Sequence, residues 1–276
     1  MVASVELRFS KYEGLGNDFI VVERDAVGRA IDTGEALRLC DRHRGIGADG
    51  VLETGLEGGR PFMRVTNADG SRPEMCGNGL RCVAAHLVSR GLVGEAFDVD
   101  TDAGPHRCIV NGHVIEVEMR APGLAPADVP VRAEAPLIGA EWEFDGERLR
   151  VTAVSMGNPH VVTFDSVSDA RRRELGPRME KDPRFSKGAN IGFAKLTGDD
   201  AIDLFVWERG AGWTEACGTG ACAAAVAAVE TGRVPRGQWV SVRLPGGVLE
   251  ILVGDPGTRV RMRGPARHVF DGTVTL

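Results

Sequence analysis

Short apolar runs recur along the whole chain and predict many β-strands. Val5–Phe9 and Val114–Met119 alternate between apolar and polar residues, which is typical of a strand with one buried face. Phe19–Val22 is apolar throughout, as in a fully buried strand. Further strands are expected at Phe62–Thr66, Phe97–Thr101, Val151–Val154, Ile202–Trp207 and Trp239–Leu244. Turns rich in glycine and asparagine separate these runs, so we expect a protein with a large amount of sheet.

Two longer segments have a helical character instead, and each opens at a cysteine. Cys76 begins a segment that runs to Gly91, and Cys217 precedes an alanine-rich segment that ends at Gly232. Alanine has the highest helix propensity and glycine commonly ends helices, so both cysteines are expected at helix N-termini. Unpaired N–H groups give such an end about half a positive charge, which attracts carboxylates and lowers a thiol pKa from about 8.5.

Two further helices are expected on the surface. The residues DTGE at positions 32–35 match a capping box and predict a helix that continues through Arg44 and ends at Gly45. Residues 166–175 are strongly charged and predict a second helix, which Gly176 and Pro177 should stop.

The spacing of unusual residues indicates an internal repeat. Cys76 and Cys217 are separated by 141 positions, close to half of the 276 residues. The same offset relates Gly16-Asn17 to Gly157-Asn158, Gly47-Ala48 to Gly188-Ala189, Asp49 to Asn190, Val65 to Val206, Asn67 to Glu208, and Ala84 to Ala225. We therefore expect two tandem copies of one domain, with a pseudo-twofold axis that brings the two cysteines face to face.

The composition between the two copies places the expected boundary. Residues 122–136 are rich in proline and alanine, as in a linker. The predicted domains are residues 1–120 with a C-terminal strand at 266–276, and residues 121–265. Many strands with one long helix per half indicate an α+β fold, in which each curved, mostly antiparallel sheet wraps around an almost wholly apolar central helix.

Charge and composition exclude several classes of partner. The net charge is −6 with both signs interspersed, which argues against a nucleic-acid or membrane-surface partner. No segment approaches the roughly 18 apolar residues of a membrane span, and the first residues lack the apolar core of a signal peptide. We therefore expect a cytoplasmic protein with reduced thiols.

Cysteine and glycine motifs for metals and nucleotides are not matched. Cys76/Cys82 and Cys217/Cys222 lack CxxC spacing and histidine partners, so no metal site is expected. The remaining cysteines, Cys40, Cys82, Cys108 and Cys222, are expected in the core. GIGADG at positions 45–50 fits GxGxxG, but a helix precedes it and a strand follows, which is the reverse of a dinucleotide site. There is no GxxxxGK[ST] loop either.

Two thiols on opposite sides of one carbon are suited to inverting it. A thiolate removes a proton from one face while a thiol delivers a proton to the other, so the pair predicts amino-acid racemisation or epimerisation. No lysine lies in a setting that favours a Schiff base, so no cofactor is expected. Backbone N–H groups at Gly77-Asn78 and Gly218-Thr219 would hold the substrate carboxylate.

A second polar set predicts recognition of the far end of the substrate. Arg209 suits a distal carboxylate and Glu208 suits an ammonium group. His160 follows a Gly-Asn-Pro turn and could tune a thiol. The remaining members of the set are Asn17, Asn67, Asn158 and Asn190.

At this point the sequence resembles the diaminopimelate epimerase family over essentially its whole length. The matching motifs are GLGNDF, RHRGIGADG, NADGS, MCGNGLRC, VSMGNPH, GANIGF, WERGAG, ACGTGAC and LPGG, in this order. The resemblance implies interconversion of LL- and meso-diaminopimelate in bacterial lysine and peptidoglycan precursor synthesis, by a homodimer. It also implies that Cys76 and Cys217 are the acid and base, and that His160 and Glu208 tune them. The implied substrate-binding residues are Asn17, Asn67, Gly77, Asn78, Asn158, Asn190, Glu208, Arg209, Gly218 and Thr219.

The sequence departs from the family pattern at two positions, and two other functions stay open. Gly50 stands where some members have a substrate-contacting glutamine, and Trp213 is bulky for its position. One alternative is a two-cysteine racemase of proline, hydroxyproline or histidine, although a one-headed substrate has no use for Arg209. The other is an inactive binding protein of the same fold, against which the presence of both cysteines argues.

Overall fold

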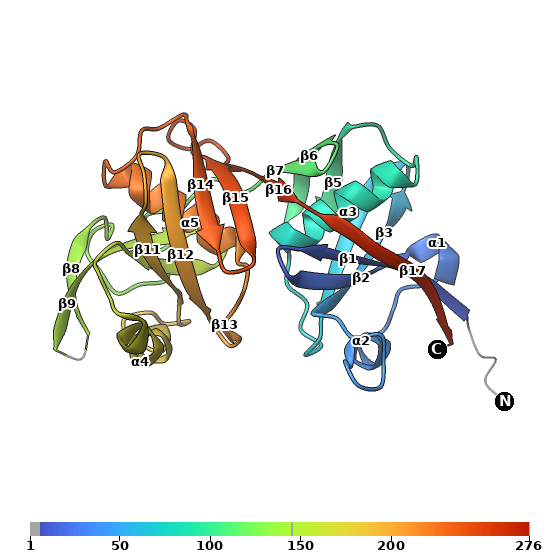
Figure 1. Cartoon of the computed structure of the whole chain (residues 1–276), viewed down its shortest axis with the longest axis horizontal. Coiled ribbons are helices and arrows are strands. Elements are labelled where there is room, and N and C mark those ends of the chain that lie inside the picture. Colours follow the sequence, from blue (N-terminus) through green and yellow to red (C-terminus); the bar gives the residue numbers. More distant parts are fainter. Residues whose placement is uncertain (1–5, 145, 276) are drawn as a thin grey trace. The chain divides into compact units, whose positions relative to one another are not determined.

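The computed structural model describes residues 6–144 and 146–275, and the chain divides into two compact units (Figure 1). The first unit contains Met1–Glu118 and Arg263–Leu276, and the second contains Met119–Met262. The proline-rich segment 122–136, which we expected as a linker, therefore lies within the second unit. Val5, the first residue of the first expected strand, lies outside the described residues.

The first unit is a curved sheet around one helix. Its strands are β1 (Glu6–Gly14), β2 (Asn17–Glu23), β3 (Gly50–Glu57), β4 (Arg60–Asn67), β5 (Ala96–Thr101), β6 (Gly104–Asn111), β7 (Val114–Glu118) and β17 (Arg267–Thr275). Its helices are α1 (Arg24–Val27), α2 (Thr33–Cys40) and α3 (Gly77–Ser89). The pairs β17/β1, β1/β2, β3/β4, β5/β6 and β6/β7 are antiparallel, whereas β2/β3 and β4/β5 are parallel. Helix α3 packs against β1, β2, β3, β4, β6, β7 and β17.

The second unit repeats this pattern of pairing. Its strands are β8 (Ala140–Phe144), β9 (Glu147–Ser155), β10 (Pro159–Thr163), β11 (Asn190–Leu196), β12 (Ala201–Glu208), β13 (Gly212–Trp213), β14 (Trp239–Leu244) and β15 (Gly247–Leu252), and β16 (Arg261–Pro265) crosses from this unit to the first. Its helices are α4 (Asp169–Glu180) and α5 (Gly218–Glu230). Antiparallel β8/β9, β9/β10, β11/β12 and β14/β15 are joined through parallel β10/β11 and β12/β14. The same alternation in both units confirms the predicted repeat and the α+β fold class.

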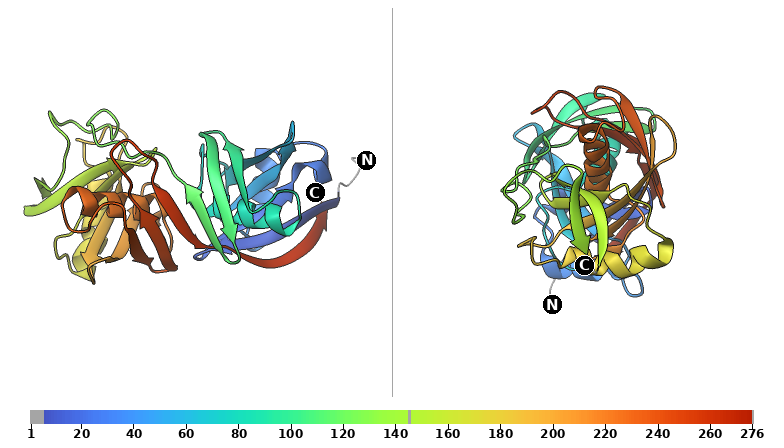
Figure 2. Two further views of the ribbon diagram at one scale, coloured as in Figure 1. Left: turned by 90° about the horizontal axis from the view of Figure 1, so that it is seen from above. Right: turned by 90° about the vertical axis from the view of Figure 1, so that its left-hand side faces the viewer.

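The two central helices differ in what they bury. Every residue of α5 from Ala221 to Ala228 is fully buried, and Figure 2 shows this helix among the strands of its own unit. Alanines allow the strands to approach the helix backbone closely. Helix α3 instead buries the polar side chains of Asn78, Arg81 and His86. The expectation of an almost wholly apolar helix is therefore right for α5 and wrong for α3.

Helix α4 does not stop where the sequence suggested. It continues through Gly176 and Pro177 to Glu180. Its indole neighbour explains the glycine, because a Cβ on Gly176 would lie 3.1 Å from the side chain of Trp207. Trp207 Nε1 also donates to Glu180 Oε2 at 2.6 Å, which fastens the end of the helix to β12. Gly176 therefore allows close packing and does not end the helix.

Helix α2 starts as predicted and ends earlier. The Asp32 side chain accepts from the Glu35 N–H at 2.9 Å and the Glu35 carboxylate accepts from the Asp32 N–H at 3.0 Å, which confirms the capping box. The helix ends at Cys40 rather than Arg44. Asp41 causes this difference, because its carboxylate accepts from the N–H groups of His43 and Arg44 and folds them into a turn.

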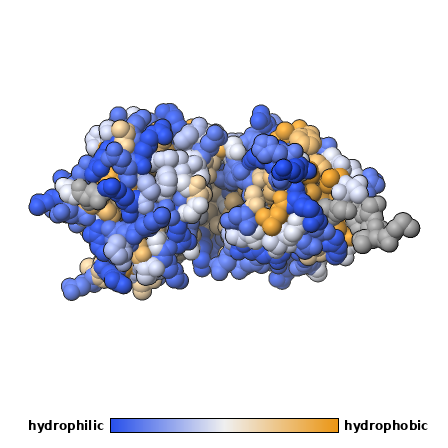
Figure 3. Space-filling view, turned by 90° about the horizontal axis from the view of Figure 1, so that it is seen from below, coloured by the Kyte–Doolittle hydropathy of each residue, from blue (hydrophilic) through white to orange (hydrophobic). Residues whose placement is uncertain are grey.

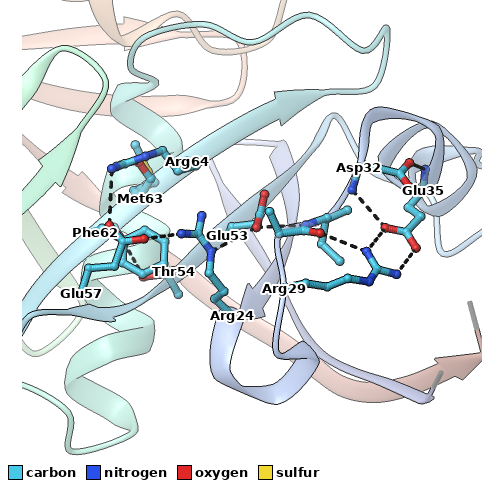
Figure 4. Close-up of polar contacts among 12 residues, drawn as sticks. Arg24, Arg29, Asp32, Glu35, Glu53, Thr54, Glu57, Phe62, Met63 and Arg64 are labelled. Atoms are coloured by element: carbon cyan, nitrogen blue, oxygen red, sulfur yellow. Dashed lines mark hydrogen bonds and ion pairs between the residues drawn. The ribbon is translucent and has the colours of Figure 1, made fainter.

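Charged side chains fasten the segment between β2 and α2 to the sheet (Figure 4). Arg29 donates to both oxygens of Glu35, at 2.7 and 2.5 Å. This bidentate contact lowers the pKa of Glu35 to about 2. Arg24 lies over the Phe62 ring at 4.3 Å, and the Glu53 carboxylate accepts from the Ile31 N–H at 3.1 Å.

Within the described residues, no helix is long and apolar enough to cross a membrane.

Candidate active site

Both cysteines occupy the N-cap positions of the central helices, as predicted. Cys76 begins α3 with φ −134° and ψ 115°, and Cys217 begins α5 with φ −128° and ψ 101°. The Cys76 sulfur accepts from the Gly79 N–H at 3.4 Å. Glycine three residues after each cysteine avoids crowding, because a Cβ on Gly79 would lie 2.9 Å from the Leu52 side chain. A Cβ on Gly220 would lie 3.1 Å from the Cys217 sulfur.

In the first unit, the structure brings Asn17 and Asn78 together. Asn78 Nδ2 donates to Asn17 Oδ1 at 3.2 Å, and Asn17 Nδ2 donates to Asp49 Oδ2 at 2.6 Å. Arg81 Nη2 donates to Asn78 Oδ1 at 3.0 Å. Two of the predicted substrate-binding residues therefore form one hydrogen-bonded group beside the start of α3.

Asn67 has a separate environment in the same unit. It ends β4 opposite Gly50, and its Nδ2 donates to Ser71 Oγ at 2.9 Å. Among the described residues, its side-chain partner is this turn residue and not another predicted site residue. The pairing also accounts for Gly50, because a Cβ there would lie 2.9 Å from the Thr66 carbonyl oxygen. A glutamine could not enter this backbone arrangement without moving β4.

In the second unit, a parallel group links Asn158 to Cys217. Asn158 Nδ2 donates to Thr219 Oγ1 at 3.4 Å, and Thr219 Oγ1 lies 3.7 Å from the Cys217 sulfur. His160 Nε2 contacts Asn158 Oδ1 at 3.1 Å. Burial, and secondarily Arg209, lowers the pKa of His160 to about 3. The imidazole is therefore neutral near pH 7, and Nε2 acts as the donor to the amide oxygen.

Asn190 and Arg209, two members of the predicted recognition set, lie where β11 begins and just after β12 ends. Asn190 is buried and its Oδ1 accepts from the Arg209 backbone N–H at 2.9 Å, while its Nδ2 donates to the Pro159 carbonyl at 2.9 Å. The exposed Arg209 guanidinium donates to the Lys187 carbonyl at 2.6 Å. Trp213 packs edge-on against Trp207, with ring centres 5.5 Å apart. This indole packing explains the bulky residue at position 213.

The half-buried Glu208 interacts with the buried Cys217 at the start of α5. Burial raises the pKa of Glu208, although Thr214 Oγ1 donates to its carboxylate at 2.5 Å. Cys217 is 4% exposed, and burial followed by the charge of Glu208 raises its pKa well above the usual value. The expectation that the helix N-terminus lowers both thiol pKa values is therefore wrong for Cys217. Desolvation outweighs the helix dipole here, so Cys217 is a thiol near pH 7.

Three residues that hydrogen-bond to predicted site residues were not themselves predicted from the sequence: Asp49, Arg81 and Thr214. Arg81 left a signal, because it is a basic residue within a segment that was otherwise expected to be buried. Asp49 left another, because the repeat aligns it with Asn190. Within the described part of the chain, no cluster of three or more histidine, cysteine or acidic residues could hold a metal ion.

Comparison with known proteins identifies relatives of the whole chain. The family model "Diaminopimelate epimerase" matches residues 9–122 and 152–269. A diaminopimelate epimerase from Synechocystis sp. is 45% identical over 280 residues, covering 98% of this chain and 99% of the relative. Another from Desulforudis audaxviator is 46% identical over 275 residues, covering 96% of this chain and 98% of the relative.

Solved structures with low sequence identity share the fold. A PhzF-family phenazine biosynthesis protein from Bacillus anthracis has a TM-score of 0.71 at 16% identity, covering 98% of this chain and 99% of that chain. A probable proline racemase from Agrobacterium radiobacter K84 has a TM-score of 0.69 at 14% identity, covering 98% of this chain and 93% of that chain. These likenesses confirm the predicted architecture.

Proposed function

The chain belongs to the diaminopimelate epimerase family, and we propose that it interconverts LL- and meso-diaminopimelate by a two-base mechanism without a cofactor. The observation that supports the mechanism most is the placement of Cys76 and Cys217 at equivalent helix N-termini. Each thiol lies beside backbone N–H groups that suit a carboxylate. The proposed role is in lysine and peptidoglycan precursor synthesis.

The raised pKa of Cys217 supports an assignment of proton donor and acceptor. Cys217 is protonated because of burial and Glu208, so it delivers a proton from the resting enzyme. The Cys76 thiolate removes the α-proton from the opposite face of the same carbon. The C–H electron pair stays on the carbon until Cys217 protonates it, which leaves Cys76 as thiol and Cys217 as thiolate. The reverse reaction exchanges these roles.

The substrate carboxylate at the reacting carbon would accept from the helix N-termini at Gly77-Asn78 and Gly218-Thr219. These donors stabilise the charge that develops as the α-proton leaves. Arg209 and Glu208 would recognise the distal carboxylate and ammonium group, respectively. The amides proposed to complete substrate binding are those of Asn17, Asn67, Asn158 and Asn190. His160 positions Asn158 by its Nε2 donor.

Epimerisation in heavy water tests this function. The purified protein, without added pyridoxal phosphate or metal, should convert LL-diaminopimelate to the meso form with one solvent deuterium at the inverted carbon. Proline and lysine should be very poor substrates, because neither offers a distal carboxylate to Arg209. Faster racemisation of proline would favour the related racemases, and a requirement for a bound cofactor would refute the two-base mechanism.

We also propose a homodimer that forms through the first unit. The described hydrophobic residues with large exposed areas lie mostly in this unit: Leu37, Leu56, Leu92, Ile109, Val114, Val269 and Phe270, against Ile138, Phe205 and Val248 in the second. Figure 3 shows apolar surface gathered on the unit that carries the N-terminus. Val269 and Phe270 are neighbours on β17, and a second copy of this surface would cover them.

Sedimentation of a charged variant tests the dimer. Phe270→Asp should convert dimers to monomers at micromolar concentration, because it buries a carboxylate at the proposed contact. Phe205→Asp is the matched control, since Phe205 is 38% exposed in the second unit and Phe270 is 45% exposed in the first. Equal masses for wild type and Phe270→Asp would contradict this surface assignment.

A further inference from the structure

A chain of hydrogen bonds in the first unit connects an anion to a cation through two amides. Asp49 Oδ2 accepts from Asn17 Nδ2 at 2.6 Å. Asn17 Oδ1 accepts from Asn78 Nδ2 at 3.2 Å, and Asn78 Oδ1 accepts from Arg81 Nη2 at 3.0 Å. All four residues belong to the same unit, so this order does not depend on how the two units are placed.

Arg81 is held firmly at the cationic end. Its side chain is fully buried, and Nε donates to the Pro265 carbonyl at 3.2 Å. Nη1 donates to the Gly77 carbonyl at 3.4 Å. The guanidinium also fills the space beside Gly14, where an added Cβ would lie 3.3 Å from Nη2. Packing and hydrogen bonds therefore fix the direction in which Nη2 donates.

Asp49 is held at the anionic end. Its Oδ1 accepts from Arg42 Nη2 at 2.8 Å, and its Oδ2 accepts from the Asp18 backbone N–H at 3.1 Å as well as from Asn17. Arg42 also pairs with the Asp18 carboxylate at 2.6 Å, so the guanidinium bridges the two acidic residues. These contacts keep the Asp49 carboxylate directed at the Asn17 amide.

The charges at the ends determine which way both amides face. A carboxylate can only accept and a guanidinium can only donate. Asn17 and Asn78 must therefore turn their nitrogens toward Asp49 and their oxygens toward Arg81. An amide in a neutral setting could rotate and exchange its donor and acceptor. The Asn17 amide nitrogen keeps a second N–H, which no group in the described residues accepts.

We propose that Asp49 and Arg81 are positioning residues that fix the Asn17 amide as a hydrogen-bond donor to a substrate carboxylate, with Asn78 as the link. The proposal rests on the function proposed above, in which Asn17 contacts substrate. The second unit supports it by contrast, because the repeat offset places Cys222 at the position of Arg81 and Asn190 at that of Asp49. Asn158 there is oriented by the neutral His160.

Steady-state kinetics of Asp49→Asn provide the first test. Loss of the anionic end lets the Asn17 amide rotate, so KM for diaminopimelate should rise about tenfold while kcat changes less than about threefold. Asp98→Asn is the matched control, because Asp98 is an exposed aspartate of the same unit that pairs with Arg107 rather than with Arg42. It should leave KM near the wild-type value. An unchanged KM in Asp49→Asn, or the same increase in both variants, would overturn the proposal.

The second test needs no substrate. In protein labelled with ¹⁵N-asparagine, the Asn17 side-chain amide is identified by its loss in Asn17→Ala. The chemical shifts of its two amide protons should differ widely in wild type, because one of the protons is donated to a carboxylate. The difference between the two chemical shifts should shrink in Asp49→Asn and in Arg81→Lys, and persist in Asp98→Asn. Unchanged Asn17 signals would refute the orienting role of the hydrogen-bond chain even in an active enzyme, whereas an inactive wild type would refute only the proposed function.

A double mutant tests whether the two ends act through one chain. Arg81→Lys keeps the charge and loses the planar fork, so it should raise KM about as much as Asp49→Asn. If Asp49 and Arg81 both orient the Asn17 amide, KM of the double variant should lie within about threefold of KM of the more impaired single variant. Effects on KM that multiply instead would show two independent contributions and contradict a single hydrogen-bond chain.

Discussion

Helices α3 and α5 both begin at an N-cap cysteine, but the side chains around them differ in charge. In the first unit, α3 buries Arg81 and the adjoining asparagines end on the Asp49 carboxylate. In the second unit, α5 is apolar, and the Asn158 amide accepts a hydrogen bond from the neutral His160. The repeat therefore conserves backbone and small residues, while a few side chains make the halves electrostatically different.

That difference suits a reaction that needs one acid and one base at a time. A symmetric pair of thiols would hold the same number of protons on each side. Burial beside Glu208 keeps Cys217 protonated, whereas Cys76 is only partly buried. The comparison of the halves thus supports Cys217 as the proton donor of the resting enzyme.

Removing either thiol should have the largest effect. Cys76→Ala and Cys217→Ala should each lower kcat by about 10²–10⁴-fold, because each removes a proposed general acid–base group. The controls are Cys82→Ala and Cys222→Ala, which change buried cysteines inside the same helices and should keep most of the activity. Activity near the wild-type level in either member of the first pair would show that the halves are not partners in catalysis.

A change at Arg209 tests what the second unit adds to recognition. Arg209→Lys keeps the charge and loses bidentate donation, so kcat/KM for diaminopimelate should fall by at least about tenfold. Arg243→Lys is the control, since Arg243 is an exposed residue of the same unit that pairs with Asp203. Equal kcat/KM values for the two variants would exclude Arg209 from substrate binding.

The carboxylate of Glu208 should account for part of the protonation of Cys217. Glu208→Gln removes the negative charge that raises the pKa of Cys217, so its methylthiolation should begin at lower pH. Peptide mass spectrometry after treatment with a small methanethiosulfonate follows Cys217 alone. Glu215→Gln changes an exposed neighbour in the same loop and should leave the profile in place. An unchanged profile in Glu208→Gln would assign the raised pKa to burial alone.

Acid should distinguish the two units by a smaller effect on stability. Arg29 lowers the folded-state pKa of Glu35 to about 2, below its unfolded value, so the stabilisation is present above pH 5 and is lost as the pH falls toward 2. The loss should reach roughly 3 kcal/mol and loosen α2 in the first unit. Hydrogen exchange of α2 between pH 5 and 3 measures it. Glu35→Gln should remove the pH dependence, whereas Glu174→Gln on α4 should not.

Local patterns predicted the strands and both cysteine helices because alternation, alanine content and glycine stops act within a few residues. The sequence misjudged the end of α4, since Gly176 is selected by the distant indole of Trp207. The hydrogen bond from Arg81 to the Pro265 carbonyl could not be predicted for the same reason, because the two residues are far apart in the sequence. The pKa of Cys217 could not be predicted either, since burial depends on the whole unit.

The strand pairing also has a consequence for the order in which the chain can fold as it is made. The second unit is continuous, so all of Met119–Met262 is available once that stretch has emerged from the ribosome. The first unit must wait, because β1 pairs with β17, with Glu6 opposite Thr275. Until residues 267–275 are synthesised, one edge of β1 has no partner from β17, and the nascent first half must be kept from pairing with other chains. The half that is translated first is thus the half that is completed last.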